Sequence, residues 1–261
     1  MLTRRTAAGA MVGVLAVLVA GCRGPAPAAD EALGTTPPPT TTSITPAAPT
    51  TPKPTPTPTA DISKLSAAKI LAKAQAAAKA AKSVRMKGTI ADGRDRMTLD
   101  VRLAKGAGQG TIKTNGITTT VMVIGKTAYL KLSDDFWRGQ AKSKAQADAV
   151  IGLIAGRWIR TTLDSKEFSD FALFADKAAV FDGMFEPTGK VRKTAPRTIG
   201  GVPAIGLRDS DGTLWVDRAT GRPLRLETSG TDVVTFTEYD RVPTPKAPPA
   251  DQVIDGEALG G

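Results

Sequence analysis

The segment Met97-Thr-Leu-Asp-Val-Arg-Leu103 alternates strictly between apolar and polar residues. Successive side chains of a β-strand point to opposite faces of a sheet, so this alternation predicts a strand with one buried and one solvated face. A sheet that is wet on one side is typical of antiparallel pairing, because parallel sheets are usually covered on both faces. The segment therefore predicts an antiparallel sheet with a single apolar face, against which the rest of the fold must pack.

The segments on either side repeat this pattern and are separated by turn signals. Asp92-Gly93, Asn115-Gly116 and Gly125-Lys126 lie between the nearer runs, and Asp211-Gly212 and Thr220-Gly221 lie between runs in the last third of the chain. Such pairs favour the tight turns that join antiparallel strands. We therefore expect two groups of strands, comprising 84–90, 97–103, 108–113, 117–124 and 127–132, then 190–194, 202–207, 213–217, 224–228 and 232–239.

Helical periodicity appears in three places. Between Ser66 and Lys82 the apolar residues fall on one arc of a helix and four lysines on the other, where they are either simply solvated or meet anionic lipid headgroups. A second helix is expected over 143–155. The segment Leu163–Phe185 spaces its phenylalanines by three and four residues, which predicts one continuous helix whose aromatic stripe packs in the core or faces a ligand cavity. The order of elements favours an α+β fold, with one large antiparallel sheet and helices packed on one face.

The first 22 residues indicate export. Arg4 and Arg5 precede an uncharged segment whose apolar core is too short for a membrane span and fits a signal peptide. The segment ends in Leu18-Val-Ala-Gly-Cys22, which resembles the bacterial lipobox. We expect residues 1–21 to be removed, and Cys22, the only cysteine, to carry a diacylglycerol that holds the protein on the outer face of the cytoplasmic membrane.

Composition divides the rest of the chain. Residues 22–60 are rich in Pro and Thr, which predicts an extended tether that begins at the lipidated cysteine. We expect residues 61–245 to form one folded domain and residues 246–261 to form an extended tail. The net charge of +10 arises within 61–245. Because an exported lipoprotein rarely meets nucleic acid, this charge favours the membrane, anionic lipids, lipoglycans or wall polymers as partners.

The composition also excludes much catalytic chemistry. The chain has no histidine, which removes the Ser-His-Asp and Cys-His arrangements and the usual metal ligand. Asp209-Ser-Asp-Gly212 resembles the start of a calcium loop, but the remaining ligands are missing and a hairpin turn is expected there. Gly106-Ala-Gly-Gln-Gly110 leads into a strand, so no helix N-terminus awaits a phosphate. We therefore expect no enzyme activity, no cofactor and no metal.

Several features in sequence order carry a family resemblance. The lipobox and tether are followed by Gly125-Lys-Thr-Ala-Tyr-Leu130, Gly201-Val-Pro-Ala-Ile-Gly-Leu207 and Gly212-Thr-Leu-Trp-Val-Asp-Arg-Ala-Thr-Gly-Arg-Pro-Leu-Arg-Leu226. Over about residues 62–255 the chain resembles the actinobacterial envelope lipoproteins of the LppX/LprAFG group, which share the fold of the carriers LolA and LolB. The resemblance implies a curved antiparallel half-barrel with helices on its concave face, and an apolar cavity that carries acylated glycolipids or lipoglycans.

The residues of such a cavity follow from the alternation and the aromatic stripe. A dry cavity would spare a diacyl lipid about 0.8 kcal/mol per methylene otherwise exposed to water. The inner-face candidates are Leu99, Val101, Val121, Val123, Leu130, Leu214, Val216, Leu226, Val234 and Phe236, and the candidates for the lid and mouth are Phe171, Phe174, Phe181, Trp137 and Trp158.

The sequence also permits a second function. The same fold also suits a sensor, or an accessory subunit for an envelope transporter or wall enzyme, that carries no lipid. A cavity within the usual ligand-site range of about 300–1,000 Å³ would favour the carrier. A filled core with an exposed apolar patch would favour the interaction module.

Overall fold

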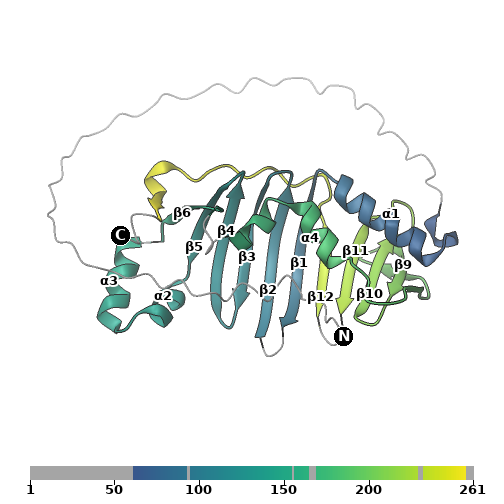
Figure 1. The fold of residues 1–261 in the computed structure, drawn as a ribbon, viewed down its shortest axis with the longest axis horizontal. Coiled ribbons are helices and arrows are strands. Elements are labelled where there is room, and N and C mark those ends of the chain that lie inside the picture. Colours follow the sequence, from purple (N-terminus) through teal and green to yellow (C-terminus); the bar gives the residue numbers. More distant parts are fainter. Residues whose placement is uncertain (1–60, 93–94, 155, 165–168, 229–231, 257–261) are drawn as a thin grey trace, which may run out of the picture.

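The computed structural model describes residues 61–92, 95–154, 156–164, 169–228 and 232–256. The expected signal peptide, Cys22 and the tether lie outside these residues. The described chain forms one thirteen-stranded, largely antiparallel sheet with four α-helices, which confirms the α+β prediction (Figure 1). None of its helices is both long and apolar enough to cross a membrane.

The first group of strands is a continuous meander. Each strand pairs antiparallel with the next, and Val101 lies opposite both Met86 and Gly110. Asn115 and Gly116 have φ angles of 52° and 85°, as the tightest hairpin turns require. The five predicted strands of this group are thus confirmed, as β1 (Ser83–Asp92), β2 (Asp95–Ala104), β3 (Ala107–Thr114), β4 (Ile117–Ile124) and β5 (Thr127–Leu132). The sheet continues with β6 (Trp158–Thr162), which was not among the expected strands and pairs antiparallel with β5.

The second group joins the first through its last strand. β9 (Val202–Arg208), β10 (Gly212–Asp217), β11 (Pro223–Thr228) and β12 (Val233–Thr237) follow one another antiparallel, and β12 then pairs with β1. The short strands β7 (Arg192–Lys193) and β8 (Arg197–Ile199) both pair with β9 and complete that edge. β8 was not predicted from the sequence, since its three residues are too few for a periodic signal.

The C-terminal segment returns to the opposite edge of the sheet. After the 3₁₀ turn η3 (Ala250–Gln252), strand β13 (Val253–Asp255) pairs parallel with β6, whereas the other described pairs are antiparallel. In Figure 1 this yellow segment passes along the strand ends to reach β6. Part of the expected extended tail therefore supplies an edge strand.

The helices pack on one face of the sheet, called here the inner face. They are η1 (Ile62–Lys64), α1 (Ala67–Ala80), α2 (Asp134–Gln140), α3 (Lys144–Ile154), the 3₁₀ helix η2 (Ser169–Phe174) and α4 (Lys177–Met184). α1 and α3 confirm two of the predicted helices. α2 was missed, although Ser133 followed by Asp134 and Asp135 is a helix-start signal.

The prediction of one helix over Leu163–Phe185 is wrong. Asp176 leaves the helical conformation, with φ −115° and ψ 79°, and its carboxylate accepts a hydrogen bond from Ala179 N at 3.0 Å. It therefore caps α4 and separates it from η2. Phe168, part of the predicted stripe, lies outside the described residues.

The hydrophobic core lies between the inner face and the helices. Ile70, Ala74 and Ala78 of α1 are completely buried, so α1 approaches its neighbours through small side chains. The rings of Phe181 and Phe185 stack with centroids 5.3 Å apart, and Phe236 of β12 lies 5.4 Å from Phe185. These contacts join the helical layer to the middle of the sheet.

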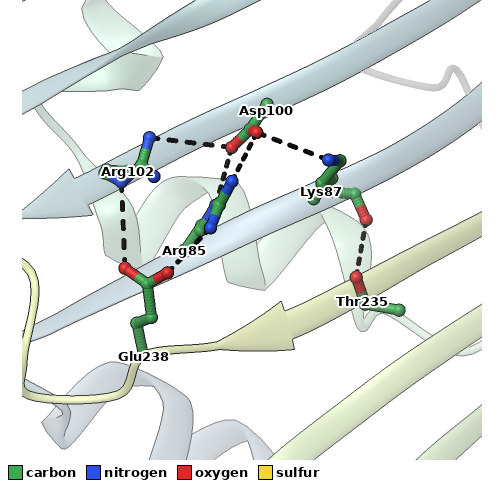
Figure 2. Close-up of polar contacts among 6 residues, drawn as sticks. All are labelled: Arg85, Lys87, Asp100, Arg102, Thr235 and Glu238. Atoms are coloured by element: carbon green, nitrogen blue, oxygen red, sulfur yellow. Dashed lines mark hydrogen bonds and ion pairs between the residues drawn. The ribbon is translucent and has the colours of Figure 1, made fainter.

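The opposite, outer face carries a network of charges on β1, β2 and the end of β12. Figure 2 shows Arg85 between Asp100 and Glu238. Its guanidinium donates to both Asp100 carboxylate oxygens, at 2.8 and 2.6 Å, and to Glu238 Oε1 at 2.8 Å. These hydrogen bonds hold the pKa of Asp100 below its usual value of 3.8.

We expect Asp100→Asn to lower the free energy of unfolding at pH 7 by about 1–2 kcal/mol, because it removes charge-assisted hydrogen bonds at a partly solvated site. The folded-state pKa of Asp100 is lower than the unfolded-state value. Its contribution is therefore fully present above pH 3.8 and is lost as the pH falls through the folded-state value. Urea unfolding at several pH values should show the difference from wild type shrinking as the medium is acidified below about pH 4. Asp135→Asn, at an exposed site on α2, should change little at any pH. A difference for Asp100→Asn that is independent of pH would contradict this account.

Candidate functional site

The structure brings the predicted inner-face residues together on one surface. Leu226 is half-buried, and the other members are buried: Leu99, Val101, Val121, Val123, Leu130, Leu214, Val216, Val234 and Phe236. They come from six strands of both meanders. The alternation therefore predicted the correct face of each strand.

The aromatic residues of the helical layer cover this surface. Phe174 of η2 and Phe181 of α4 are buried in the same cluster, and Phe171 packs against it half-buried. η2 approaches β3 so closely that a Cβ on Gly108 would lie 2.2 Å from the carbonyl oxygen of Phe174. A glycine at this position is thus required for η2 to lie where it does.

The two predicted tryptophans lie elsewhere. Trp137 is buried in a second cluster with Ile154 and Ile159, where α2 and α3 cover the end of the inner face. Trp158 precedes the inward-facing Ile159 and so projects to the outer face, where Lys131 Nζ lies 5.0 Å from the centroid of its ring. Trp158 does not adjoin the Phe174–Phe181 layer because it is one residue out of phase with the inner face. Trp137 does not adjoin it because it belongs to the second cluster.

Several core residues were not among the candidates. They belong to the same cluster and comprise the strand residues Val84, Met86, Leu103, Ile112, Ile205 and Leu207, together with Phe185 at the end of α4. Each lies in a segment whose periodicity had been recognised. The signal that could have identified them was therefore present in the sequence.

A small pocket opens at the end of the helical layer, between α1, the C-terminal end of α4 and strands β9–β11. Its apolar lining includes Leu71, Met184 and Leu226, while Asp209 and Thr228 are its polar lining residues. Its volume is about 30 Å³, which is room for one or two water molecules. This pocket is therefore too small for an acyl chain, which would have to displace part of the helical layer in order to enter there.

Polar contacts fasten α4 to α1. The buried Lys177 donates from Nζ to the carbonyl oxygens of Ala78 and Lys79 at 2.9 and 2.8 Å. These bonds give a partner to carbonyls at the C-terminal end of α1 that have none within the helix. Burial lowers the pKa of Lys177 from its usual value. Lys79 also forms an ion pair with Asp182, and Gln75 Nε2 donates to Phe185 O at 3.2 Å.

α1 itself is held to the sheet at both ends. At its N-terminal side, Ile62 N donates to Arg218 O at 3.0 Å, and Arg218 pairs with Asp61, whose pKa is lowered by that hydrogen-bonded partner. At its C-terminal side, Lys82 N donates to Asp240 Oδ1 at 2.6 Å. α4 instead contacts the sheet through apolar side chains such as Phe181, whose ring lies 6.0 Å from that of Phe236.

The polar side chains near the pocket have structural partners. Asp209 Oδ1 accepts from Asp211 N and Gly212 N, both at 3.0 Å, which makes the expected hairpin turn rather than a calcium loop. No group of three or more potential metal ligands occurs in the described part of the chain. The main feature of this site is therefore an apolar surface under a helical layer.

Several solved structures match this architecture, and two of them are compared with it here. The fold is similar to that of LprF. The crystal structure of LprF from Mycobacterium bovis matches with a TM-score of 0.46 and 15% sequence identity, covering 69% of this chain and 96% of that one. An uncharacterized conserved protein from Thermus thermophilus matches with a TM-score of 0.36 and 11% identity, covering 72% and 98%. No protein-family profile and no curated protein sequence matches the chain. The fold assignment rests on the strands and helices described above.

Proposed function

We propose that this protein is an envelope lipoprotein that binds the acyl chains of a lipid, glycolipid or lipoglycan between the inner face of its sheet and the layer formed by α1, η2 and α4. The observation that carries the proposal is the nature of this interface. One apolar surface, drawn from both meanders, is covered by a separate helix that contacts it through aromatic and aliphatic side chains. Acyl chains can replace such contacts without leaving a buried polar group unpaired.

We propose that the acyl chain binds by displacing α4 from the sheet. An acyl chain enters at the small pocket beside Leu226 and Met184, and α4 moves away from the sheet while α1 stays tied at both ends. The contacts of Lys177 with α1 must lengthen or break for this to occur. The headgroup remains outside, and no covalent bond changes, which agrees with the absence of histidine.

The proposal places the protein on the outer face of the cytoplasmic membrane. Cys22 would carry the anchor, and residues 23–60 would let the domain move between the bilayer and a partner in the envelope. Such a partner would be a transporter or a wall enzyme, and carriage or presentation of the lipid would be the outcome.

The test is native mass spectrometry of the full chain carrying Cys22→Ser, purified from a bacterial host without detergent. We expect a co-purifying mass that matches a diacyl lipid. Leu226→Trp, which fills the pocket from a half-buried inner-face position, should abolish it. Met122→Trp, at a half-buried outer-face position, should retain it.

Weakening the contacts between α4 and α1 gives a second readout. Lys177→Met removes both hydrogen bonds from α4 to the end of α1, and should speed the uptake of an added diacyl lipid. A bare protein mass in wild type, with no uptake of added lipid, would refute the proposal.

One observation favours a second candidate, the sensor or accessory module that carries no lipid. The pocket of about 30 Å³ is far below the range of about 300–1,000 Å³ expected for a preformed ligand site. The described surface does not, however, present the large apolar patch that such a module would use, since its exposed large hydrophobic residue is Leu153 alone. The bare-mass outcome above would favour this module.

A further inference from the structure

Two arginines lie directly opposite each other on the outer face at the β7–β9 edge of the sheet. Arg192 of β7 pairs in register with Arg208 of β9, and Arg208 pairs in turn with Thr213 of β10. Leu207, the neighbour of Arg208, is buried on the inner face, so both arginines project outward. Like charges in directly opposed positions destabilise strand pairing. The pair therefore costs stability unless an anion lies between the two guanidinium groups.

A tryptophan and a third arginine adjoin this pair. Trp215 of β10 pairs with Gly206 and is 3% exposed, and the guanidinium carbon of Arg197 lies 5.1 Å from the centroid of its ring. A Cβ at Gly206 would lie 2.2 Å from Thr194 Oγ1 and 3.0 Å from that ring, so the glycine makes room for both. The ring holds the Arg197 guanidinium by a cation–π contact, while the side chain remains exposed.

The indole nitrogen of Trp215 is a buried donor without a partner. Its Nε1 has no hydrogen-bond acceptor in the described structure. Buried indole N–H groups usually find an acceptor. A ligand oxygen that reached this nitrogen would provide one.

Arginines elsewhere on the same face are neutralised. In Figure 2, Arg85 and Arg102 are both within ion-pair distance of Asp100 and Glu238. Among the described residues, Arg192, Arg197 and Arg208 form no ion pair with an acid. The nearby Glu227 is occupied by Arg225, at 3.0 Å from its Nε. The edge of the sheet thus carries three exposed guanidinium groups without a compensating carboxylate, beside one buried indole donor.

We propose that Arg192, Arg197 and Arg208 form a binding site for a phosphate group above Trp215. Guanidinium groups bind phosphate through paired N–H···O bonds, and a phosphate has enough oxygens and charge to meet more than one of them. The phosphate belongs either to a lipid headgroup or to a soluble phosphate or phosphodiester. This site lies on the face opposite the proposed acyl site, so the phosphate proposal does not depend on the proposed lipid binding.

The test follows the three tryptophan indole N–H signals of the ¹⁵N-labelled full chain carrying Cys22→Ser, with Trp215→Phe used to assign the signal. Titration with glycerol 1-phosphate and with inorganic phosphate should shift the Trp215 signal saturably and leave those of Trp137 and Trp158 unmoved. The double variant Arg192→Gln/Arg208→Gln should weaken binding about tenfold or more. The matched control Lys105→Gln/Lys113→Gln removes the same charge from exposed positions in and beside β3, and should change the affinity less than about twofold.

Vesicle sedimentation distinguishes the sources of the phosphate. Binding to phosphatidylglycerol vesicles that is lost in the arginine variant and kept in the lysine variant identifies a lipid headgroup. Saturable binding of glycerol 1-phosphate without vesicle binding identifies a soluble phosphate. Urea unfolding midpoints equal to that of wild type show that both variants are folded. Equal weakening in the two double variants, or an unmoved Trp215 signal together with no vesicle binding, would overturn the proposal.

Discussion

Replacing Phe181 by alanine is expected to lower the free energy of unfolding by about 3–5 kcal/mol. Phe181 is completely buried, and its ring contacts Phe185 and Phe236 with centroids 5.3 and 6.0 Å away. Truncation removes the aromatic contact between α4 and Phe236 of the sheet and leaves a cavity that the surrounding side chains only partly fill. Urea unfolding followed by tryptophan fluorescence measures the effect.

Leu153→Ala is the control for this measurement, because Leu153 is 56% exposed and its truncation should cost no more than about 0.5 kcal/mol. The cavity in Phe181→Ala should also take up a small apolar molecule such as benzene, since an engineered apolar cavity of this kind stays dry. A loss of stability no larger than that of Leu153→Ala would show that α4 does not pack on the sheet as described.

Gly108→Val is expected to cost about 3 kcal/mol. Any Cβ at this position would lie 2.2 Å from Phe174 O and 3.0 Å from Leu103 Cδ2. The first of these is a backbone atom, so the clash is relieved only when η2 moves away from β3. We expect a lower midpoint of urea unfolding, together with a shift of the Phe174 amide signal in NMR spectra.

The neighbouring residue provides the control. Gln109 projects to the outer face of the same strand, and Gln109→Val should leave stability within about 0.5 kcal/mol of wild type, because valine suits a strand. Equal stability of the two valine variants would contradict the close approach of η2. Because η2 belongs to the helical layer over the proposed acyl site, Gly108→Val also tests whether displacing η2 promotes lipid uptake.

Much of the fold could be predicted from local pattern. Residues 97–103 and their neighbours showed their two faces by alternation, and Asn115-Gly116 marked a turn that requires positive φ angles. The break at Asp176 could have been predicted too, since Asp is a preferred N-cap, but the regular spacing of the phenylalanines outweighed it. The three-residue strands β8 and β13 could not, because they exist only through their pairing partners β9 and β6.

For the candidate site, too, some features could be predicted from local pattern and others could not. Alternation alone assigned Val121 and Val123 to the inner face, since each residue's side follows from its own strand. The volume left between sheet and helices depends on how side chains from distant segments fill a shared space, so only the tertiary structure shows that the pocket holds about 30 Å³. The tertiary structure likewise decided that Lys177 caps α1, and that Arg192 faces Arg208, sixteen residues along the chain. Periodicity is a property of one segment, whereas free volume, unpaired charge and the tie between two helices arise only when segments meet.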